Sequence, residues 1–262
     1  MKYKKQDKLV LMILILLTPM AFCLEGPDFM LIGDYYIPTG NGFCITAKSY
    51  DKAGLSTVFR SASLYGVGSL KWINSGVKLY SQFGSVGVVF RDYGINDLYS
   101  STAFKIFLQK SLLWKISLGA SYSHNAYIYG DDTYRSSHDG ISFTAGWSLH
   151  DLNIAILIDN KSLNNKNGYS DELEFIISGC WSANEILSFY GVYFKDKLDK
   201  NRFLIGQKLE LIKPLIIEAG FLSGPEIYFV GLEVVYKRLV FGYTFFDVGA
   251  LPDCSRLTLS YR

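Results

Sequence analysis

The side chains most able to do chemistry gather in one polar stretch, from His124 to Asp139. Its titratable members are His124, Asp131, Asp132, His138 and Asp139. Carboxylate and imidazole groups of this kind can activate water for hydrolysis or hold a metal ion. The sequence supplies no oriented nucleophile and no oxyanion hole beside them, and Asp, Ser, Tyr and Gly are ordinary residues of exposed loops. We therefore expect a solvated outer loop, no enzyme activity, no metal and no cofactor.

Aromatic residues accompany this loop and the last loop of the chain. They are Tyr127, Tyr129 and Tyr134 in the first, and Phe245, Phe246 and Leu251 around the second. Exposed apolar patches often mark a docking surface. The aromatic girdle of a membrane protein has the same composition. Both interpretations of this outer rim, docking surface and girdle, stay open.

The elements that position these residues are predicted to be β-strands. From residue 112 onward, Leu112, Trp114, Ile116, Leu118, Ala120 and Tyr122 alternate with Lys115, Ser117, Gly119, Ser121 and Ser123. Side chains alternate between the two faces of a strand, so one face is apolar and the other small or polar. Many such segments reach the roughly 9–11 residues that cross a bilayer, whereas strands of a soluble sandwich, the alternative, have about 5–6. We predict an all-β, transmembrane antiparallel β-barrel.

The loops and turns between these segments are alternately long and short. Counted back from Arg262, short breaks include Lys237–Arg238 and His150–Asp151, and long ones include 159–171 and 124–138. Outer-membrane barrels have short periplasmic turns and longer outer loops. The pattern predicts about fourteen strands, beginning near Ser69 to Ile73, in a barrel spanning 66–262. Residues 24–65 remain as an N-terminal segment that either plugs the lumen or supplies extra strands.

The N-terminus predicts export. Four lysines precede an apolar run from Leu9 to Leu17 that is too short for a membrane helix. We interpret residues 1–23 as a cleavable signal peptide, with a lipid anchor on Cys23 as the alternative. The other cysteines, Cys44, Cys180 and Cys254, have no metal-type spacing. A net charge of +2 with scattered basic residues gives no concentrated basic face for nucleic acid. The expected location is the bacterial outer membrane, with its lipid as the first partner.

Charged residues also occur at the alternate strand positions that carry small or polar residues. We assign this face of the strands to the lumen. The charged residues are Lys105, Lys115, Glu174, Lys208, Glu210, Glu218, Glu233 and Arg256. Such side chains line a pore or bind a polar solute, or else they pair across a packed interior. Their near balance of acids and bases favours pairing over an ion-selective ring.

Short motifs near both ends resemble the PorV/PorQ family of outer-membrane proteins, relatives of FadL-type transporters. The matching stretches are Phe29-Met30-Leu31-Ile32-Gly33, Gly40-Asn41-Gly42 with Ala47 and Asp51, Phe83-Gly84-Ser85-Val86-Gly87 ahead of Tyr93-Gly94, Asp247-Val248-Gly249, and Arg256-Leu257-Thr258-Leu259-Ser260-Tyr261-Arg262. The family's Asn-Pro-Ala motif is missing from Phe59 to Ser63, so the chain resembles a divergent member.

The resemblance implies a FadL-like barrel that works with a type IX-like secretion or surface-attachment system, with secretion-machinery or cargo proteins as partners. No residue of the sequence identifies a cargo. Two alternatives stay open beside this function. One is a FadL-like passive channel for small hydrophobic solutes, and the other is an outer-membrane barrel enzyme.

Overall fold

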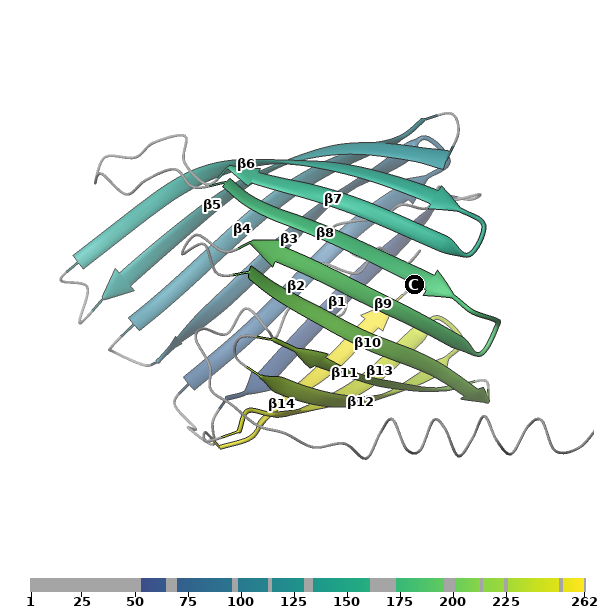
Figure 1. Ribbon diagram of the computed structural model, residues 1–262. Coiled ribbons are helices and arrows are strands. Elements are labelled where there is room, and N and C mark those ends of the chain that lie inside the picture. Colours follow the sequence, from purple (N-terminus) through teal and green to yellow (C-terminus); the bar gives the residue numbers. More distant parts are fainter. Residues whose placement is uncertain are drawn as a thin grey trace, which may run out of the picture.

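The computed structural model describes residues 53–64, 70–95, 99–112, 115–129, 134–160, 173–195, 201–212, 214–223, 226–249 and 252–261. These residues form fourteen antiparallel strands that close into a barrel (Figure 1). The strands are β1 (Gly54–Ser63), β2 (Leu70–Ser81), β3 (Gly84–Ile95), β4 (Tyr99–Ser111), β5 (Ile116–Tyr129), β6 (Tyr134–Leu149), β7 (Leu152–Asn160), β8 (Leu173–Ser182), β9 (Leu187–Lys195), β10 (Asn201–Ile212), β11 (Leu215–Leu222), β12 (Ile227–Tyr236), β13 (Leu239–Asp247) and β14 (Cys254–Tyr261). The predicted fold class is confirmed.

Every strand pairs with its neighbours in the sequence, and β1 pairs with β14 to close the wall. Closure leaves no sheet edge, so the backbone N–H and C=O groups of the wall find partners within it, as a lipid environment requires. One register shift interrupts the pairing of β10 with β11, between Glu210 and Ile212. It lies at the end of the strands, next to a short turn.

Strand β1 corrects the predicted start of the barrel, which lies at Gly54 and not at residue 66. The extra-strand alternative therefore holds for Gly54–Ser63. The alternation was weak here because Thr57, Ser61 and Ser63 occupy outward positions, where the other strands mostly carry apolar residues. The rest of the N-terminal segment predicted over 24–65, namely residues 24–52, and the predicted signal peptide, residues 1–23, lie outside the described residues.

The short turns lie at one end of the barrel. Four of them leave only two residues between the strands, and in two of these turns the first residue, His150 or Lys237, has a positive φ angle, of 46° and 56° respectively. Such positive angles are typical of tight hairpins whose turn follows the twist of the strands. Tyr261 pairs with Leu239, the residue after the second of these turns. The chain therefore ends on the short-turn side, as the loop pattern predicts.

The two faces of the wall differ sharply in exposure. On β5, Leu118 is 49% exposed and its neighbour Ser117 is 1% exposed. On β6, Phe143 is 58% exposed and Ser142 is fully buried. Large apolar side chains thus point outward along whole strands, and small or polar ones point inward. An outward apolar belt of this kind is what a barrel presents to lipid.

Aromatic rings border the outward belt at both ends. Near the short turns, Trp181 stacks on Phe189 with ring centroids 6.0 Å apart. Toward the other end, the rings of Phe203, Phe221 and Tyr228 follow one another across β10, β11 and β12 at 6.0 and 5.1 Å. Aromatic side chains prefer the two membrane–water interfaces. The two rows therefore mark where the wall enters and leaves the bilayer.

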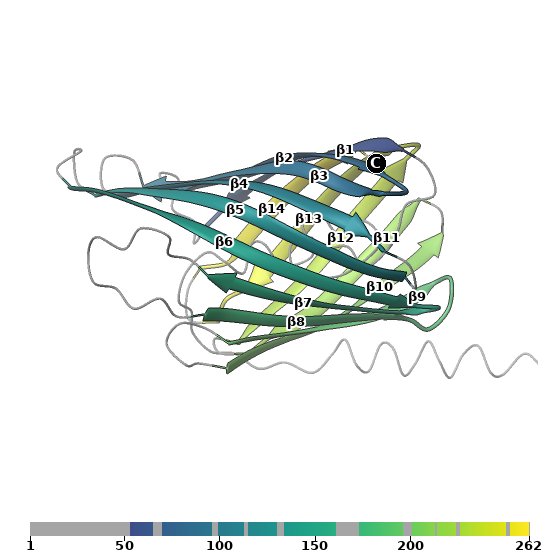
Figure 2. The same cartoon turned by 90° about the horizontal axis from the view of Figure 1, so that it is seen from above.

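Strands β5 and β6 are the longest, with 14 and 16 residues. The described part of β7 pairs with β6 only as far as Ile141, whereas β6 itself extends back to Tyr134. Figure 2 shows β6 reaching well beyond the end of β7, whereas β4 stays paired with β5 as far as Tyr99 and Tyr129. We call residues 124–129 and 134–139 the projecting hairpin.

Candidate functional site

The inward face of the wall carries a polar cluster around Glu218 on β11. The Tyr190 hydroxyl, from β9, donates a hydrogen bond to Glu218 Oε1 over 2.6 Å. Lys208 Nζ, from β10, lies 3.9 Å from Glu218 Oε2. The strand register creates this contact, because Lys208 and Glu218 are direct cross-strand partners. The Glu218 carboxylate is only 3% exposed. The Tyr190 hydroxyl on one side and the Lys208 ammonium on the other offset the cost of burying its charge.

The guanidinium of Arg256 is held farther round the wall, on β14. Its Nη2 donates to Thr244 Oγ1 over 3.2 Å, and its Cζ lies 5.5 Å from the centre of the Phe246 ring. A hydroxyl and an aromatic face thus fix the orientation of a cation that is 6% exposed. Glu233 of β12 also occupies an inward position. It lies two residues along β12 from Gly231, which is the cross-strand partner of Thr244.

Glycines make room for the rings beside this cluster. Gly206 lies directly across from Tyr190, and Gly220 directly across from Phe229. A Cβ at either glycine would collide with the facing ring. The rings therefore lie over glycine backbone, which lets Tyr190 reach across β10 to Glu218.

Gly206→Ala is expected to lower the free energy of unfolding by about 1–3 kcal/mol, since the new methyl group displaces the buried Tyr190 ring and breaks its bond to Glu218. Gly191→Ala is the matched control on the neighbouring strand, because its Cβ would meet only Leu204 O, at 3.7 Å. Urea unfolding followed by tryptophan fluorescence measures both variants. Equal stability of the two variants would contradict the packing described here.

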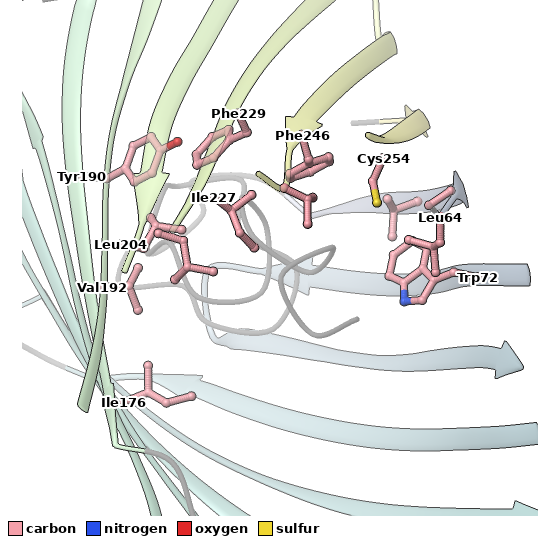
Figure 3. Close-up of a cluster of buried hydrophobic side chains, with 14 of the residues drawn as sticks. Leu64, Trp72, Ile176, Tyr190, Val192, Leu204, Ile227, Phe229, Phe246 and Cys254 are labelled. Atoms are coloured by element: carbon pink, nitrogen blue, oxygen red, sulfur yellow. The ribbon is translucent and has the colours of Figure 1, made fainter. Parts of the chain in front are cut away.

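Apolar side chains also point into the barrel. Figure 3 shows Trp72, Ile227 and Phe246 directed inward from β2, β12 and β13. Ile227 and Phe246 are fully buried, and Trp72 is 1% exposed. Side chains that line a wide aqueous channel are wetted by it. At the level of these residues, the wall therefore does not line such a channel.

The structure places most of the predicted luminal charges on the inward face: Lys105, Lys208, Glu218, Glu233 and Arg256. Lys105 Nζ donates to Ser142 Oγ over 3.3 Å. Lys115 is a correction, because it lies exposed in the turn before β5 with a φ of 60°. Glu210 is also exposed, at the register shift that ends β10. The side chain of Glu174 lies outside the described residues.

Several inward polar residues were missed by the sequence analysis. They are Arg60, Asn74, Lys78, Arg91 and Arg202. Among the inward side chains that the structure describes, Arg60, Lys78, Arg91, Lys105, Arg202, Lys208 and Arg256 are basic, and Glu218 and Glu233 are acidic. The expected near balance of charge is therefore wrong for the described wall. The alternation of strand faces, applied to residues 70–95, would have placed Lys78 and Arg91 on the inward face. Arg60 belongs to the segment that was predicted to lie outside the barrel.

The predicted outer rim does not form one surface. Phe245 is 39% exposed on the outward face of β13, whereas its neighbour Phe246 is fully buried inside the barrel. Tyr127 is half-buried and lies on the inward face of β5. The side chains of Tyr129 and Tyr134, and the whole of Leu251, lie outside the described residues. Consecutive residues of a strand face opposite sides, so residues adjacent in sequence were separated.

The titratable stretch 124–139 is mostly strand, which corrects the predicted loop. His124 on β5 and Asp139 on β6 are direct cross-strand partners on the outward face. His124 Nδ1 lies 2.7 Å from Asp139 Oδ1, and the Tyr122 hydroxyl donates to the same oxygen over 2.6 Å. The carboxylate is thus held between a phenol and an imidazole at the upper border of the apolar belt. Asp131, Asp132 and the side chain of His138 lie outside the described residues.

The described residues contain no group of three or more His, Cys, Asp or Glu side chains placed to hold a metal ion. No helix among them is long and apolar enough to cross a membrane.

No protein-family model matches the sequence, and no curated protein matches it. Among solved structures, the outer membrane protein Omp33 of Acinetobacter baumannii is similar, with a TM-score of 0.54, 12% identity, and coverage of 80% of this chain and 98% of that chain. A triple mutant of the Rhodopseudomonas blastica porin has a TM-score of 0.43 and 8% identity over 80% of this chain and 99% of that chain, too low a score to add an argument. The likeness to Omp33 and the outward apolar belt together give this chain the fold of an outer-membrane β-barrel.

Proposed function

We propose that this barrel is an interaction component of the outer membrane, resembling the PorV/PorQ proteins, that serves a type IX-like protein secretion or surface-attachment system. The supporting observation is the combination of a closed wall, buried apolar side chains such as Ile227 and Phe246 on its inward face, and a hairpin that extends past the end of β7. Such a barrel presents a surface to other proteins more readily than it passes solutes.

The closed wall argues against lateral release of a hydrophobic solute. Each of the fourteen neighbouring pairs, including β1 with β14, is joined by a continuous ladder apart from the one shift at the end of β10. A solute that leaves sideways into lipid needs an opening in such a ladder. Among the described residues the ladder has none within the apolar belt.

The projecting hairpin offers a surface for a partner. Its outward residues Arg135 and Ser137 are exposed and polar, unlike Phe143 farther along the same face of β6. We infer that the hairpin stands in water above the bilayer, where this extension of the wall, flanked by β4 as far as Tyr99, can be bound by another protein. The partners proposed are secretion-machinery or secreted cargo proteins.

The second candidate is a FadL-like passive channel for small hydrophobic solutes. The apolar inward side chains, among them Trp72, Ile227 and Phe246, favour it, because binding sites for such solutes are lined mainly by apolar groups. It needs a continuous apolar path from the outer rim to an opening, which the described wall does not provide. We therefore place it second.

Affinity purification of the full-length barrel from its own membrane tests the proposal. Ser137→Trp places a large ring on the outward face of the projecting hairpin and is expected to lower the yield of co-purified proteins at least tenfold. Gln82→Trp, in an exposed turn at the opposite end, is the control and is expected to leave the yield unchanged. Mass spectrometry identifies and counts the partners.

Recovery of secretion-machinery or surface proteins by the parent and the control, with loss in Ser137→Trp, supports the interaction role. A parent barrel recovered alone with bound lipid overturns it. In that case, uptake of a small hydrophobic dye by barrel-containing liposomes tests the channel in its place.

A further inference from the structure

The outward face of β14, β1, β2 and β3 contains a hollow of about 350 Å³. Most of the residues that line it belong to two adjacent rows of cross-strand partners, which are Leu259, Phe59, Ser75 and Phe90 in one row, and Thr57, Val77 and Val88 in the other. All seven side chains lie at outward strand positions, within the apolar belt. We call this feature the belt hollow.

The belt hollow exists because small side chains lie between large ones. Ser75 has Phe59 as its cross-strand partner on one side and Phe90 on the other. The two rings are 47% and 42% exposed, so they stand out from the wall, and the short side chain of Ser75 does not fill the space between them. Thr57, beside Val77 in the next row, extends the same gap. The hollow thus has apolar sides and a floor of small residues.

A cation lies at the border of the belt hollow, at the short-turn end of the barrel. Tyr261 on β14 is the cross-strand partner of Thr57. Arg238, in the turn between β12 and β13, donates a hydrogen bond from Nη1 to the Tyr261 hydroxyl over 3.1 Å. This bond uses one of the five N–H donors of a guanidinium, and Arg238 is exposed. Lys237, also exposed, precedes it in the same turn and adds to the positive potential.

The position of the belt hollow limits what can occupy it. Its lining faces the lipid, and inside a bilayer the acyl chains are as apolar as a leucine side chain, so packing decides what binds there. Groups that line an empty hollow lose dispersion contacts, which a flexible acyl chain restores. The volume is within the range of about 300–1,000 Å³ that is usual for ligand pockets. The neighbouring guanidinium adds a preference for phosphate, which arginine binds through paired N–H groups.

We propose that the belt hollow and Arg238 together form a binding site for one phospholipid. An acyl chain occupies the hollow between Phe59 and Phe90, and the phosphate accepts hydrogen bonds from Arg238. Leu259 in the hollow and Tyr261 beside the guanidinium are two residues apart on β14, or roughly 7 Å along the strand. That separation places the phosphate at the border of the belt and the chain within it. The proposal does not depend on whether the barrel serves secretion or transport.

Native mass spectrometry of the full-length barrel in a neutral detergent tests the site. The barrel is titrated with phosphatidylglycerol and, separately, with a diacylglycerol that has the same acyl chains but no phosphate. One phosphatidylglycerol per barrel is expected to bind most tightly. The diacylglycerol is expected to bind about tenfold more weakly, the usual effect of losing one hydrogen bond between charged groups.

Two variants address the two halves of the site. Ser75→Phe fills the hollow and Arg238→Gln removes the phosphate donor, and each is expected to weaken phosphatidylglycerol binding about tenfold. Ala120→Phe adds a ring to the outward face of β5, and Lys110→Gln removes an exposed cation from β4. These two controls are expected to bind as the parent does. Heat-dependent gel migration checks folding, and Arg238→Gln, in an exposed turn, decides the test if Ser75→Phe does not fold.

Phosphatidylglycerol binding that is unchanged in Ser75→Phe and Arg238→Gln would overturn the proposal. Equal affinity of the parent for the two lipids would overturn the role of Arg238. A second copy of the chain is the rival occupant of the hollow, and it gives a different result. The parent would then have the mass of two chains without bound lipid, and Ser75→Phe would separate them.

Discussion

Glu218→Leu is expected to lower the free energy of unfolding of the barrel by about 3–5 kcal/mol, the usual loss when one member of a buried charged pair is removed. Glu218 accepts the hydrogen bond of Tyr190 and lies 3.9 Å from Lys208 Nζ. Without the carboxylate, the phenol loses its acceptor and the lysine, at 18% side-chain exposure, loses its nearest anion. Urea unfolding in detergent, followed by fluorescence and gel migration, measures the change.

Glu210→Leu is the control for this variant. Both glutamates occupy inward strand positions in the sequence pattern, but Glu210 is exposed at the end of β10. Substitutions at exposed positions usually change stability by less than about 0.5 kcal/mol. A Glu218→Leu barrel as stable as the Glu210→Leu barrel would show that the inward cluster contributes little to holding β9, β10 and β11 together.

Ala145→Arg is expected to destabilise the membrane-inserted barrel by about 2–4 kcal/mol, the cost of a basic side chain on the lipid face at the bilayer midplane. Ala145 is exposed on the outward face of β6, between Phe143 and Trp147. These neighbours belong to the apolar belt, so the new guanidinium has no water within reach except by distorting the bilayer.

Ser137→Arg places the same group on the same face of the same strand, eight residues away and roughly 26 Å farther along it. Because Ser137 belongs to the projecting hairpin, the cost is expected to be below about 1 kcal/mol. Reversible folding into lipid vesicles at increasing urea measures both values. Similar losses at the two positions would move the bilayer boundary up β6 and remove the hairpin from the water.

Most of the fold could be predicted from the sequence because the signals involved are local. Alternation along β5 and β6, and the tight breaks at His150 and Lys237, depend only on residues a few positions apart. They were enough to predict an antiparallel barrel with its short turns at one end. Strand β1 was missed for an equally local reason, since hydroxyl side chains at Thr57, Ser61 and Ser63 weaken its apolar parity.

The candidate sites were harder to predict, since they depend on which strands meet and at what register. Parity separates Phe245 from Phe246, but only the pairing of β5 with β6 sets His124 beside Asp139 on the outer face. In the same way, the sequence places Lys208 and Glu218 on inward positions without indicating that they face each other.

The sequence by itself determined the period of the strands, the side on which the turns lie and the apolar nature of the outer face. Only the tertiary structure decided which inward residues lie side by side: Arg60, Asn74 and Arg91, for example, come from three strands and are brought together by register. The physical reason is that alternation is a property of one strand, whereas a site on a barrel wall is a property of several strands hydrogen-bonded side by side.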